Sequence, residues 1–363
     1  MTSSNRICWV SDVGDDPSKG GGIARFLYLL KKSELIKNHV TFYSLHGLNN
    51  FGKIFFCIYL LMNGSRFFVV HSFFTPFTLF LLCIPLPLKL VILPHGELKS
   101  AALNLNSFKK ILFINLVRLF YLINKYFKKI GGIATNTEEL ILLKSIAPIS
   151  KSKKISDFFT ADIVLSKLRN FNDGSKLNIV TLARMTENKG LADFLTFFNK
   201  HLMASQNDWS NKVKNIYIFY IEESKAELRL VKRLSKRLTV QHNINVHFFS
   251  GLHPESISSR LKKIPNKIGF IPSRFESFSY TLIECLGFEY RPVVWFENEL
   301  VDSLFKKGLC SKAQYGKFLS NDGKSLIQLA KPEKNKIFLQ DMSSDILSSY
   351  QFFLEKFFKK KIT

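Results

Sequence analysis

The sequence predicts an α/β protein with two doubly wound domains, each a parallel sheet covered by helices. Short apolar runs alternate with longer helical patterns through most of the 363 residues, as is typical of parallel sheets that are buried on both faces. Two such series are separated by a polar stretch at residues 151–176. A chain of this length also suits two domains, each with its own core.

The candidate strands are the short apolar runs, and five fall in each series. They are residues 6–10, 40–45, 67–71, 89–93 and 131–135, then 177–182, 216–221, 245–249, 267–271 and 292–296. We therefore expect a first Rossmann-like domain over 1–150, a linker over 151–176 and a second Rossmann-like domain over 177–340. A final helix over 341–363 could cross back onto the first domain. Ligands of such sheets bind beyond the carboxyl ends of the strands.

The composition is strongly basic, with a net charge of +24 and 36 phenylalanines. Such a charge attracts polyanions: nucleic acid, an anionic membrane surface or phosphorylated substrates. Basic residues interleaved with phenylalanine, leucine and isoleucine favour the membrane interface. No helix-turn-helix, zinc-finger or RNP-like motif supports specific binding of nucleic acid.

The cysteines and the N-terminus indicate a cytoplasmic protein. The five cysteines lie far apart and form no C-x-x-C pair, which argues against a disulfide framework and a cysteine-based zinc site. No secretory signal fits the four-residue apolar run that follows Arg6. Residues 67–88 are uncharged but contain three prolines. We interpret them as a strand, a short helix and the approach to the next strand, with a transmembrane helix as the less favoured alternative.

A basic amphipathic helix is expected within residues 107–130. At 100° per residue, one arc holds apolar side chains and the other holds lysine, arginine and asparagine. Such a helix suits an anionic membrane surface. A helix that covers its own sheet has the same pattern, and we slightly favour that interpretation.

Three motifs follow predicted strands. Gly21 and Gly22 end a glycine run between the first strand and a helix, where a backbone can approach a ligand closely or can simply form a flexible loop. His95 and Glu97 lie just after the strand at 89–93, although a single loop histidine is more often structural. No second histidine or cysteine stands at metal-ligand spacing nearby, so we expect no metal.

Two cations follow the first strand of the second series. Arg184 and Lys189 precede a helix that begins near residue 191. Fixed cations beside a helix N-terminus can hold a diphosphate without a metal ion. A solvated charged turn would look the same in the sequence.

The most informative segment follows the strand at 267–271. Glu276 and Glu284 are separated by seven residues, across a polar loop that leads into a helix. Loop amides and a helix N-terminus can bind a phosphate, while the carboxylates accept from sugar hydroxyls. Alternatively, Thr281 and Glu284 fit a capping box, and Glu276 is then a solvated loop acid.

In this order, the motifs resemble the retaining GT-B glycosyltransferases of family 4, also called glycosyltransferase group 1. The resemblance covers residues 6–296 and is strongest over 177–294. The stretch from Leu93 to Leu103, followed by Lys109 and Lys110, is similar to members that build bacterial lipopolysaccharide, O-antigen or capsule. It implies two domains that face each other across a cleft.

The resemblance also implies a role for each matching residue. Glu276 and His95 would be the catalytic residues and would contact the transferred sugar, and Glu97 would lie in the cleft or at the acceptor side. The donor-binding residues would be Arg184, Lys189, Glu284, Phe278, Ser279, Tyr280, Gly21 and Gly22. No cofactor or metal is expected.

The expected function is the transfer of a sugar from a nucleotide-sugar donor to a lipid-linked or core-oligosaccharide acceptor. The protein would lie on the inner face of the cytoplasmic membrane. Two family glycines are replaced by Ser277 and Ser279, and serine adopts the required backbone only with strain. The alternatives are a non-catalytic GT-B-like partner in a glycan-assembly complex and a basic polyanion-binding protein.

Overall fold

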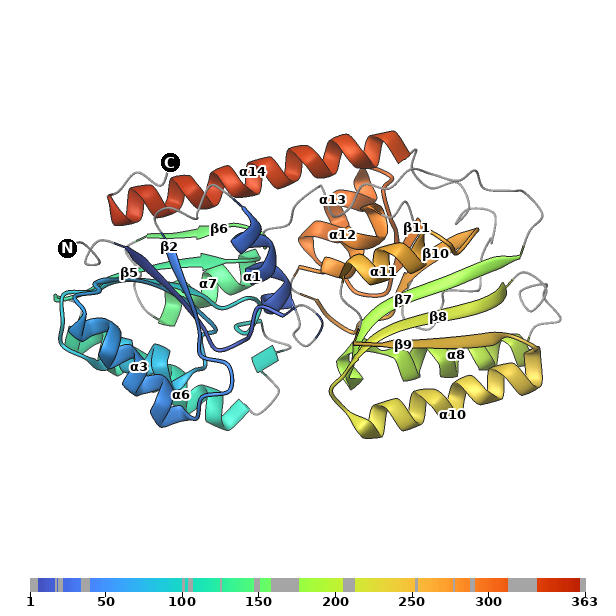
Figure 1. Cartoon of the computed structure of the whole chain (residues 1–363), viewed down its shortest axis with the longest axis horizontal. Helices are drawn as coiled ribbons and strands as arrows, with labels where there is room; N and C mark the ends of the chain where they lie inside the picture. Colours follow the sequence, from blue (N-terminus) through green and yellow to red (C-terminus); the bar gives the residue numbers. More distant parts are fainter. Residues whose placement is uncertain are drawn as a thin grey trace. The chain divides into compact units, whose positions relative to one another are not determined.

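The computed structural model describes residues 6–16, 18, 22–33, 40–99, 102–103, 107–124, 126–146, 151–157, 176–204, 213–251, 254–276, 278–287, 291–312 and 332–359. These residues form two compact units (Figure 1). Unit 1 contains those within Met1–Asp16, Gly22–Phe159 and Ser343–Thr363, and unit 2 contains those within Pro17–Gly21 and Thr160–Met342. Gly21, a predicted donor-binding residue, and Ser277 lie outside the described residues.

Unit 1 is built around a six-stranded parallel sheet with the order β2-β1-β3-β4-β5-β6. Its strands are β1 (Ile7–Ser11), β2 (Val40–Ser44), β3 (Phe67–His71), β4 (Lys89–Leu93), β5 (Lys129–Ala134) and β6 (Lys151–Lys154). Its helices include α1 (Gly22–Lys32), α3 (Asn50–Met62), α4 (Pro76–Cys83), α6 (Ser107–Asn124) and α7 (Thr137–Ile146). β6 falls inside the segment that the sequence predicts as a linker, so that prediction is wrong for its first four residues.

One face of this sheet packs against α3, α4, α6 and α7. Val10, Phe68 and Leu90 from the strands join Leu60 and Leu143 from the helices in one buried cluster. Burial of several large side chains at about 1.5–3 kcal/mol each holds this layer in place.

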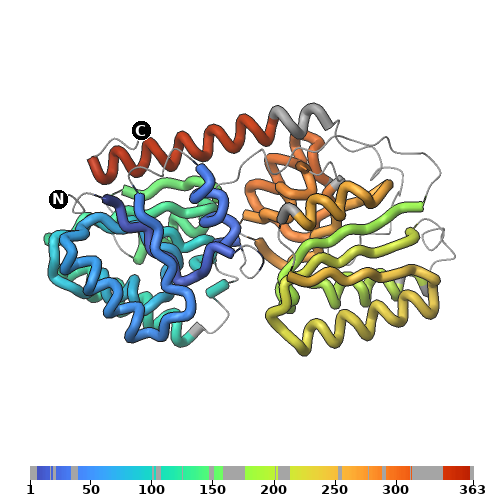
Figure 2. Tube along the Cα trace, in the orientation of Figure 1, coloured from blue at the N-terminus to red at the C-terminus, as the bar shows by residue number. Residues whose placement is uncertain are grey.

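The other face is covered by α1 and the C-terminal part of α14 (Pro332–Phe358), which Figure 2 traces in red. Gly131 allows this approach, since a Cβ at that position would lie 2.6 Å from the ring of Phe357. Lys89 donates to the carbonyl of Phe358 at 3.0 Å, and Lys129 donates to that of Phe357 at 3.3 Å. These cations satisfy carbonyls at the helix C-terminus that have no partner within the helix.

Unit 2 has a second six-stranded parallel sheet, with the order β12-β11-β10-β7-β8-β9. Its strands are β7 (Leu177–Met185), β8 (Val213–Glu222), β9 (Asn245–Ser250), β10 (Lys267–Ile271), β11 (Arg291–Val294) and β12 (Ser311–Lys312). Its helices include η2 (Glu187–Lys189), α8 (Leu191–Ala204), α10 (Lys225–His242), α11 (Pro254–Leu261), α12 (Tyr280–Gly287) and α13 (Glu299–Lys306).

The order of the strands reverses once in each sheet. In unit 1 the reversal lies between β1 and β3, and in unit 2 it lies between β7 and β10. In open α/β sheets, ligands bind at the carboxyl ends of the strands where the order reverses. The predicted fold class of two doubly wound units is confirmed.

None of the helices in the described ranges has the length and apolar character needed to cross a bilayer.

Candidate active site

Two loops of unit 2 meet at the reversal between β7 and β10. Gly190, after β7, has a φ of +64°, and a Cβ there would lie 2.1 Å from the carbonyl oxygen of Pro272, after β10. The backbone N–H of Arg274 donates to the carbonyl of Asn188 at 2.8 Å. Only glycine combines this left-handed conformation with such a close approach. The loop that carries Lys189 is therefore fixed against the loop that carries Glu276.

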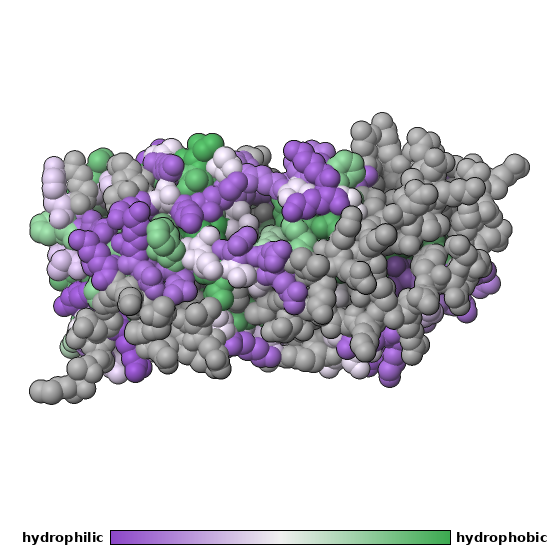
Figure 3. All heavy atoms as spheres, turned by 90° about the horizontal axis from the view of Figure 1, so that it is seen from above, coloured by the Kyte–Doolittle hydropathy of each residue, from purple (hydrophilic) through white to green (hydrophobic). Residues whose placement is uncertain are grey.

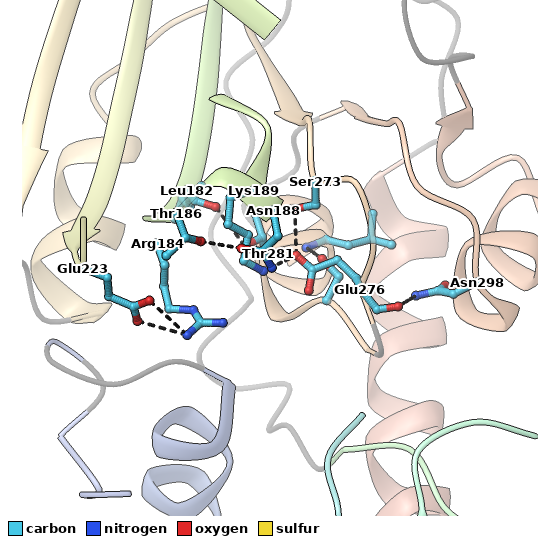
Figure 4. Close-up of polar contacts among 12 residues, drawn as sticks. Leu182, Arg184, Thr186, Asn188, Lys189, Glu223, Ser273, Glu276, Thr281 and Asn298 are labelled. Carbon is cyan, nitrogen blue, oxygen red and sulfur yellow. Dashed lines mark hydrogen bonds and ion pairs between the residues drawn. The ribbon is translucent and has the colours of Figure 1, made fainter. Parts of the chain in front are cut away.

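Lys189 and Glu276 form an ion pair across these two loops (Figure 4). The side chains are 13% and 14% exposed, respectively. The hydroxyl of Ser273 donates to the same carboxylate oxygen at 2.8 Å, and the side-chain amide of Asn298 donates to the carbonyl of Glu276 at 3.4 Å. The structure thus brings together a cation and an acid that the sequence predicts to bind donor phosphate and sugar. Neither side chain is a solvated surface charge.

Arg184 lies apart from this pair. Its guanidinium donates to both carboxylate oxygens of Glu223, at 3.0 and 3.3 Å, and Figure 4 shows it directed toward Glu223 and away from Glu276. The sequence predicts that Arg184 and Lys189 jointly hold a diphosphate. In the structure, each cation instead has a carboxylate partner.

Ser279 immediately precedes α12, in a backbone conformation that favours glycine. Its φ is +140°, and its hydroxyl accepts from the backbone N–H of Leu282 at 3.3 Å as an N-cap. The family resemblance places a glycine at this position. In this chain the residue is a serine, and its backbone has the conformation that favours glycine. The side chain of Ser279 is buried, as is that of Phe278, whose ring meets the ring of Tyr280 edge-on at 5.2 Å.

The capping-box alternative for Glu284 is wrong. Since α12 begins at Tyr280, Thr281 lies inside the helix, and its hydroxyl donates to the carbonyl of Leu182 at 3.0 Å. Glu284 lies in the body of the helix, half-buried. It therefore does not satisfy the helix end as that alternative requires.

Sequence reasoning missed several residues that hold this site. Arg274 binds Asp193 at 2.8 Å and Glu187 at 2.7 Å, and these two acids raise the pKa of its guanidinium above the usual value. Ser273, Thr281 and Asn298 add the hydrogen bonds described above. An asparagine before an acidic helix start is a recognisable N-cap signal, and Asn298 caps α13 through the N–H of Val301 at 2.8 Å.

His95, predicted to contact the transferred sugar, is buried inside unit 1. Its side chain is 2% exposed. Its Nδ1 lies 2.8 Å from Asp157, and its Nε2 lies 2.6 Å from Nδ1 of His71. Nε2 of His71 in turn accepts from the indole N–H of Trp9. Both ring nitrogens of His95 have protein partners, so the structure offers neither of them to a sugar.

This chain of contacts fixes the tautomers of both imidazoles. Trp9 can only donate, so a neutral His71 carries its proton on Nδ1 and donates to His95, which in turn donates from Nδ1 to Asp157. Burial, together with His95, lowers the pKa of His71 well below its usual value. Burial lowers the pKa of His95, but Asp157, Glu139 and Glu97 together raise it by more, so that it lies above its usual value. A second proton on His95 would force the proton of His71 onto Nε2 and break the bond to Trp9.

Two buried carboxyl groups lie around this chain. Glu97 accepts from the backbone N–H of Phe73 at 2.5 Å, and burial raises its pKa to about 7. Glu139 accepts from the N–H groups of Gly96 at 2.6 Å and Thr135 at 2.9 Å, and burial raises its pKa as well. Glu97 thus orders the loop after β3, a structural role that the sequence does not predict.

Gly22, a predicted donor-binding residue, begins α1 and is exposed.

Unit 1 also has an open pocket of about 400 Å³ at the edge of its sheet. Four lysines, Lys144, Lys151, Lys153 and Lys356, line it together with Ser152, Phe352 and Phe353. No predicted site residue lines this pocket. Within the described ranges, no group of three histidine, cysteine or acidic side chains could hold a metal ion.

The chain is similar over its whole length to solved structures. One is a sucrose-phosphate synthase from Thermosynechococcus elongatus, with a TM-score of 0.65, 11% identity and 97% of each chain covered. Another is a UDP-forming trehalose-phosphate synthase from Burkholderia xenovorans in complex with glucose-6-phosphate. Its TM-score is 0.64 at 10% identity, with 96% of this chain and 100% of that chain covered. The chain has the GT-B fold.

The catalytic domain of starch synthase IV from Arabidopsis thaliana, bound to ADP and acarbose, is a third similar GT-B structure. Its TM-score is 0.62 at 10% identity, with 99% of this chain and 100% of that chain covered. No protein-family model and no curated protein matches the sequence. The GT-B fold is therefore established by structure, whereas the substrates of these proteins are properties of those proteins.

Proposed function

We propose that this GT-B protein is a retaining, metal-independent glycosyltransferase that uses a nucleotide-sugar donor. The observation that carries the proposal is the Lys189–Glu276 pair at the reversal of strand order in unit 2. An ammonium group can donate charge-assisted hydrogen bonds to a donor phosphate, and a carboxylate can accept hydrogen bonds from sugar hydroxyls. The similar structures support the choice of donor, since two of their descriptions name UDP or ADP.

The acceptor in this proposal is a lipid-linked or core-oligosaccharide chain of a bacterial surface polysaccharide. Its support is the resemblance of residues 93–103 to enzymes that build such chains, and the net charge of +24, which suits an anionic acceptor or membrane. In this scheme, Glu276 orients the transferred sugar while Lys189 balances the charge of the departing phosphate. The ion pair holds both side chains in place before the donor arrives.

Thermal unfolding with a panel of UDP-, GDP-, ADP-, CMP- and dTDP-sugars tests the donor site. One nucleotide class should raise the unfolding temperature, because a ligand that binds only the folded state stabilises it. Glu276→Gln and Lys189→Met should each lose that shift. Asp302→Asn and Lys312→Met break another ion pair of unit 2 and serve as matched controls that keep the shift.

The outcomes separate the candidate functions. A shift that survives both Glu276→Gln and Lys189→Met refutes this donor site. Donor binding without transfer or hydrolysis favours a non-catalytic GT-B partner. Salt-sensitive binding of arbitrary DNA with no response to any nucleotide sugar favours a polyanion-binding protein.

A further inference from the structure

The outward face of α3 is apolar and exposed. Phe51, Phe55, Tyr59 and Met62 recur at helical spacing along it, with Phe51 75% and Met62 82% exposed. The one charged residue of this helix, Lys53, is paired with Asp12 at 2.5 Å. A surface helix of a soluble protein normally turns a polar face outward, so this face is a candidate contact surface.

The outward face of α6 has the same character. Eight large apolar side chains on α6 and the turn after it are more than half exposed: Phe108, Ile111, Leu112, Leu119, Leu122, Ile123, Tyr126 and Phe127. Their positions span one continuous arc of the helix, interrupted by Asn115 and Arg118. The interpretation that the apolar arc of this helix covers its own sheet is therefore wrong for Leu112, Leu119 and Ile123. Ile114 and Val117 are buried in the core of unit 1, and Phe113 and Tyr121 pack against the same cluster.

α3 and α6 lie on the same side of the unit 1 sheet, and α4 contacts both (Figures 1 and 2). We define the α3–α6 surface as the twelve exposed side chains named above. One aromatic side chain carries about 150–250 Å², so the twelve expose on the order of 1,000 Å². A typical monomer exposes a largest apolar patch of about 300–600 Å². By contrast, hydrophilic side chains are widespread on the face of unit 1 that carries α14 (Figure 3).

The charges carried by the two helices of this surface are all positive: Lys53 on α3, and Lys109, Lys110 and Arg118 on α6. Between residues 35 and 137 the sequence has eleven lysines and arginines and one acid, Glu97. The carboxylate of Glu97 is turned inward onto the N–H groups of Phe73 and Phe74. Lys109 and Arg118 are exposed on α6 among the apolar side chains. An apolar surface whose own helices carry cations and no carboxylates complements anionic headgroups above acyl chains.

We propose that the α3–α6 surface docks unit 1 onto an anionic lipid bilayer. The aromatic and aliphatic side chains enter the interface, and Lys109 and Arg118 contact the headgroups. This inference goes beyond the proposed function and does not depend on it, because lipid binding can be measured without a donor or an acceptor.

Flotation of the full chain with vesicles tests the docking. Vesicles of phosphatidylcholine are compared with vesicles that also contain phosphatidylglycerol. The triple variant Phe51→Ser, Phe55→Ser, Met62→Ser keeps every charge and should bind the anionic vesicles at least about tenfold more weakly, because each lost apolar group lowers the partition free energy. The control Val240→Ser, Phe305→Ser, Phe352→Ser removes three exposed apolar side chains elsewhere and should bind within about twofold of the unmodified chain.

A second readout does not depend on the triple variant folding. Phe55→Trp places an indole at an exposed position, and brominated acyl chains should quench it. Absence of quenching, or equal weakening in the triple variant and its control, overturns the proposal. A chain that dimerises through this surface, becomes monomeric in the triple variant and never floats with vesicles overturns it as well.

Discussion

Gly190 lies directly against the carbonyl oxygen of Pro272, where a Cβ would be 2.1 Å away. This approach joins the two loops that carry Lys189 and Glu276. The geometry of the candidate site therefore depends on a residue that has no functional group.

Gly190→Ala should destabilise the chain by at least about 3 kcal/mol, since the new methyl group would push the loops apart at a left-handed φ. Denaturant unfolding measures the change. Gly251→Ala is the matched control, because Gly251 has a φ of +58° with nothing within 4 Å. That change should cost only about 1 kcal/mol. If both variants lose the same free energy of unfolding, the contact with Pro272 contributes nothing to the cost of Gly190→Ala.

Ser279→Gly should stabilise the chain by about 1 kcal/mol. Glycine removes the strain of a φ of +140° and costs only a few tenths of a kcal/mol as an N-cap. Ser279→Ala keeps the strain, loses the cap and should destabilise by about 1 kcal/mol. The thermal unfolding temperatures should thus rank glycine above serine above alanine. Any other order contradicts this account of the loop.

Glu97→Gln should change how stability depends on pH. The pKa of Glu97 is raised to about 7 in the folded chain, whereas an unfolded glutamate titrates near pH 4.3. Between these values only the unfolded state releases its proton, so this residue lowers stability as pH rises from about 4.5 to 7. Relative to the unmodified chain, the free energy of unfolding of the variant should rise across that window by about 3 kcal/mol and then level off. A constant difference from pH 4.5 to 8 would refute the raised pKa.

When both rings are neutral, at a pH above the raised pKa of His95, the imidazoles of His71 and His95 should both carry their protons on Nδ1. Nitrogen NMR of labelled histidines distinguishes the two tautomers directly. In Trp9→Phe, the indole N–H is lost and His71 is free to adopt the other tautomer. An Nε2 proton on His71 in the unmodified chain would exclude the contact order Trp9–His71–His95–Asp157.

Most of the fold could be predicted from the sequence, because ten of its strands are short apolar runs that alternate with helical patterns. The apolar pattern missed the two-residue strand β12. It also failed for β6, whose sequence Lys-Ser-Lys-Lys has no apolar side chain and which forms the edge of a sheet. Edge strands are commonly protected by lysine, so this composition is compatible with a strand but does not predict one.

The candidate site was predicted only in part. Position relative to strand ends located Lys189 and Glu276 in neighbouring loops, and the structure joins them. Their direct contact, and the pairing of Arg184 with Glu223, depend on side-chain directions that spacing does not encode. The burial of His95 depends on Asp157, 62 residues further along the chain. No local pattern could have indicated that partner.

The packing of Phe357 against Gly131 affects the order in which the chain can fold during synthesis. The sheet of unit 1 is complete once β6 has been made, yet α14 covers it only when residues 343–359 follow. The ribosome therefore produces all of unit 2 while one face of the first sheet is covered by α1 but not yet by α14. Unit 2 can fold as soon as its own strands exist. The unit that is made first is thus the unit that is finished last.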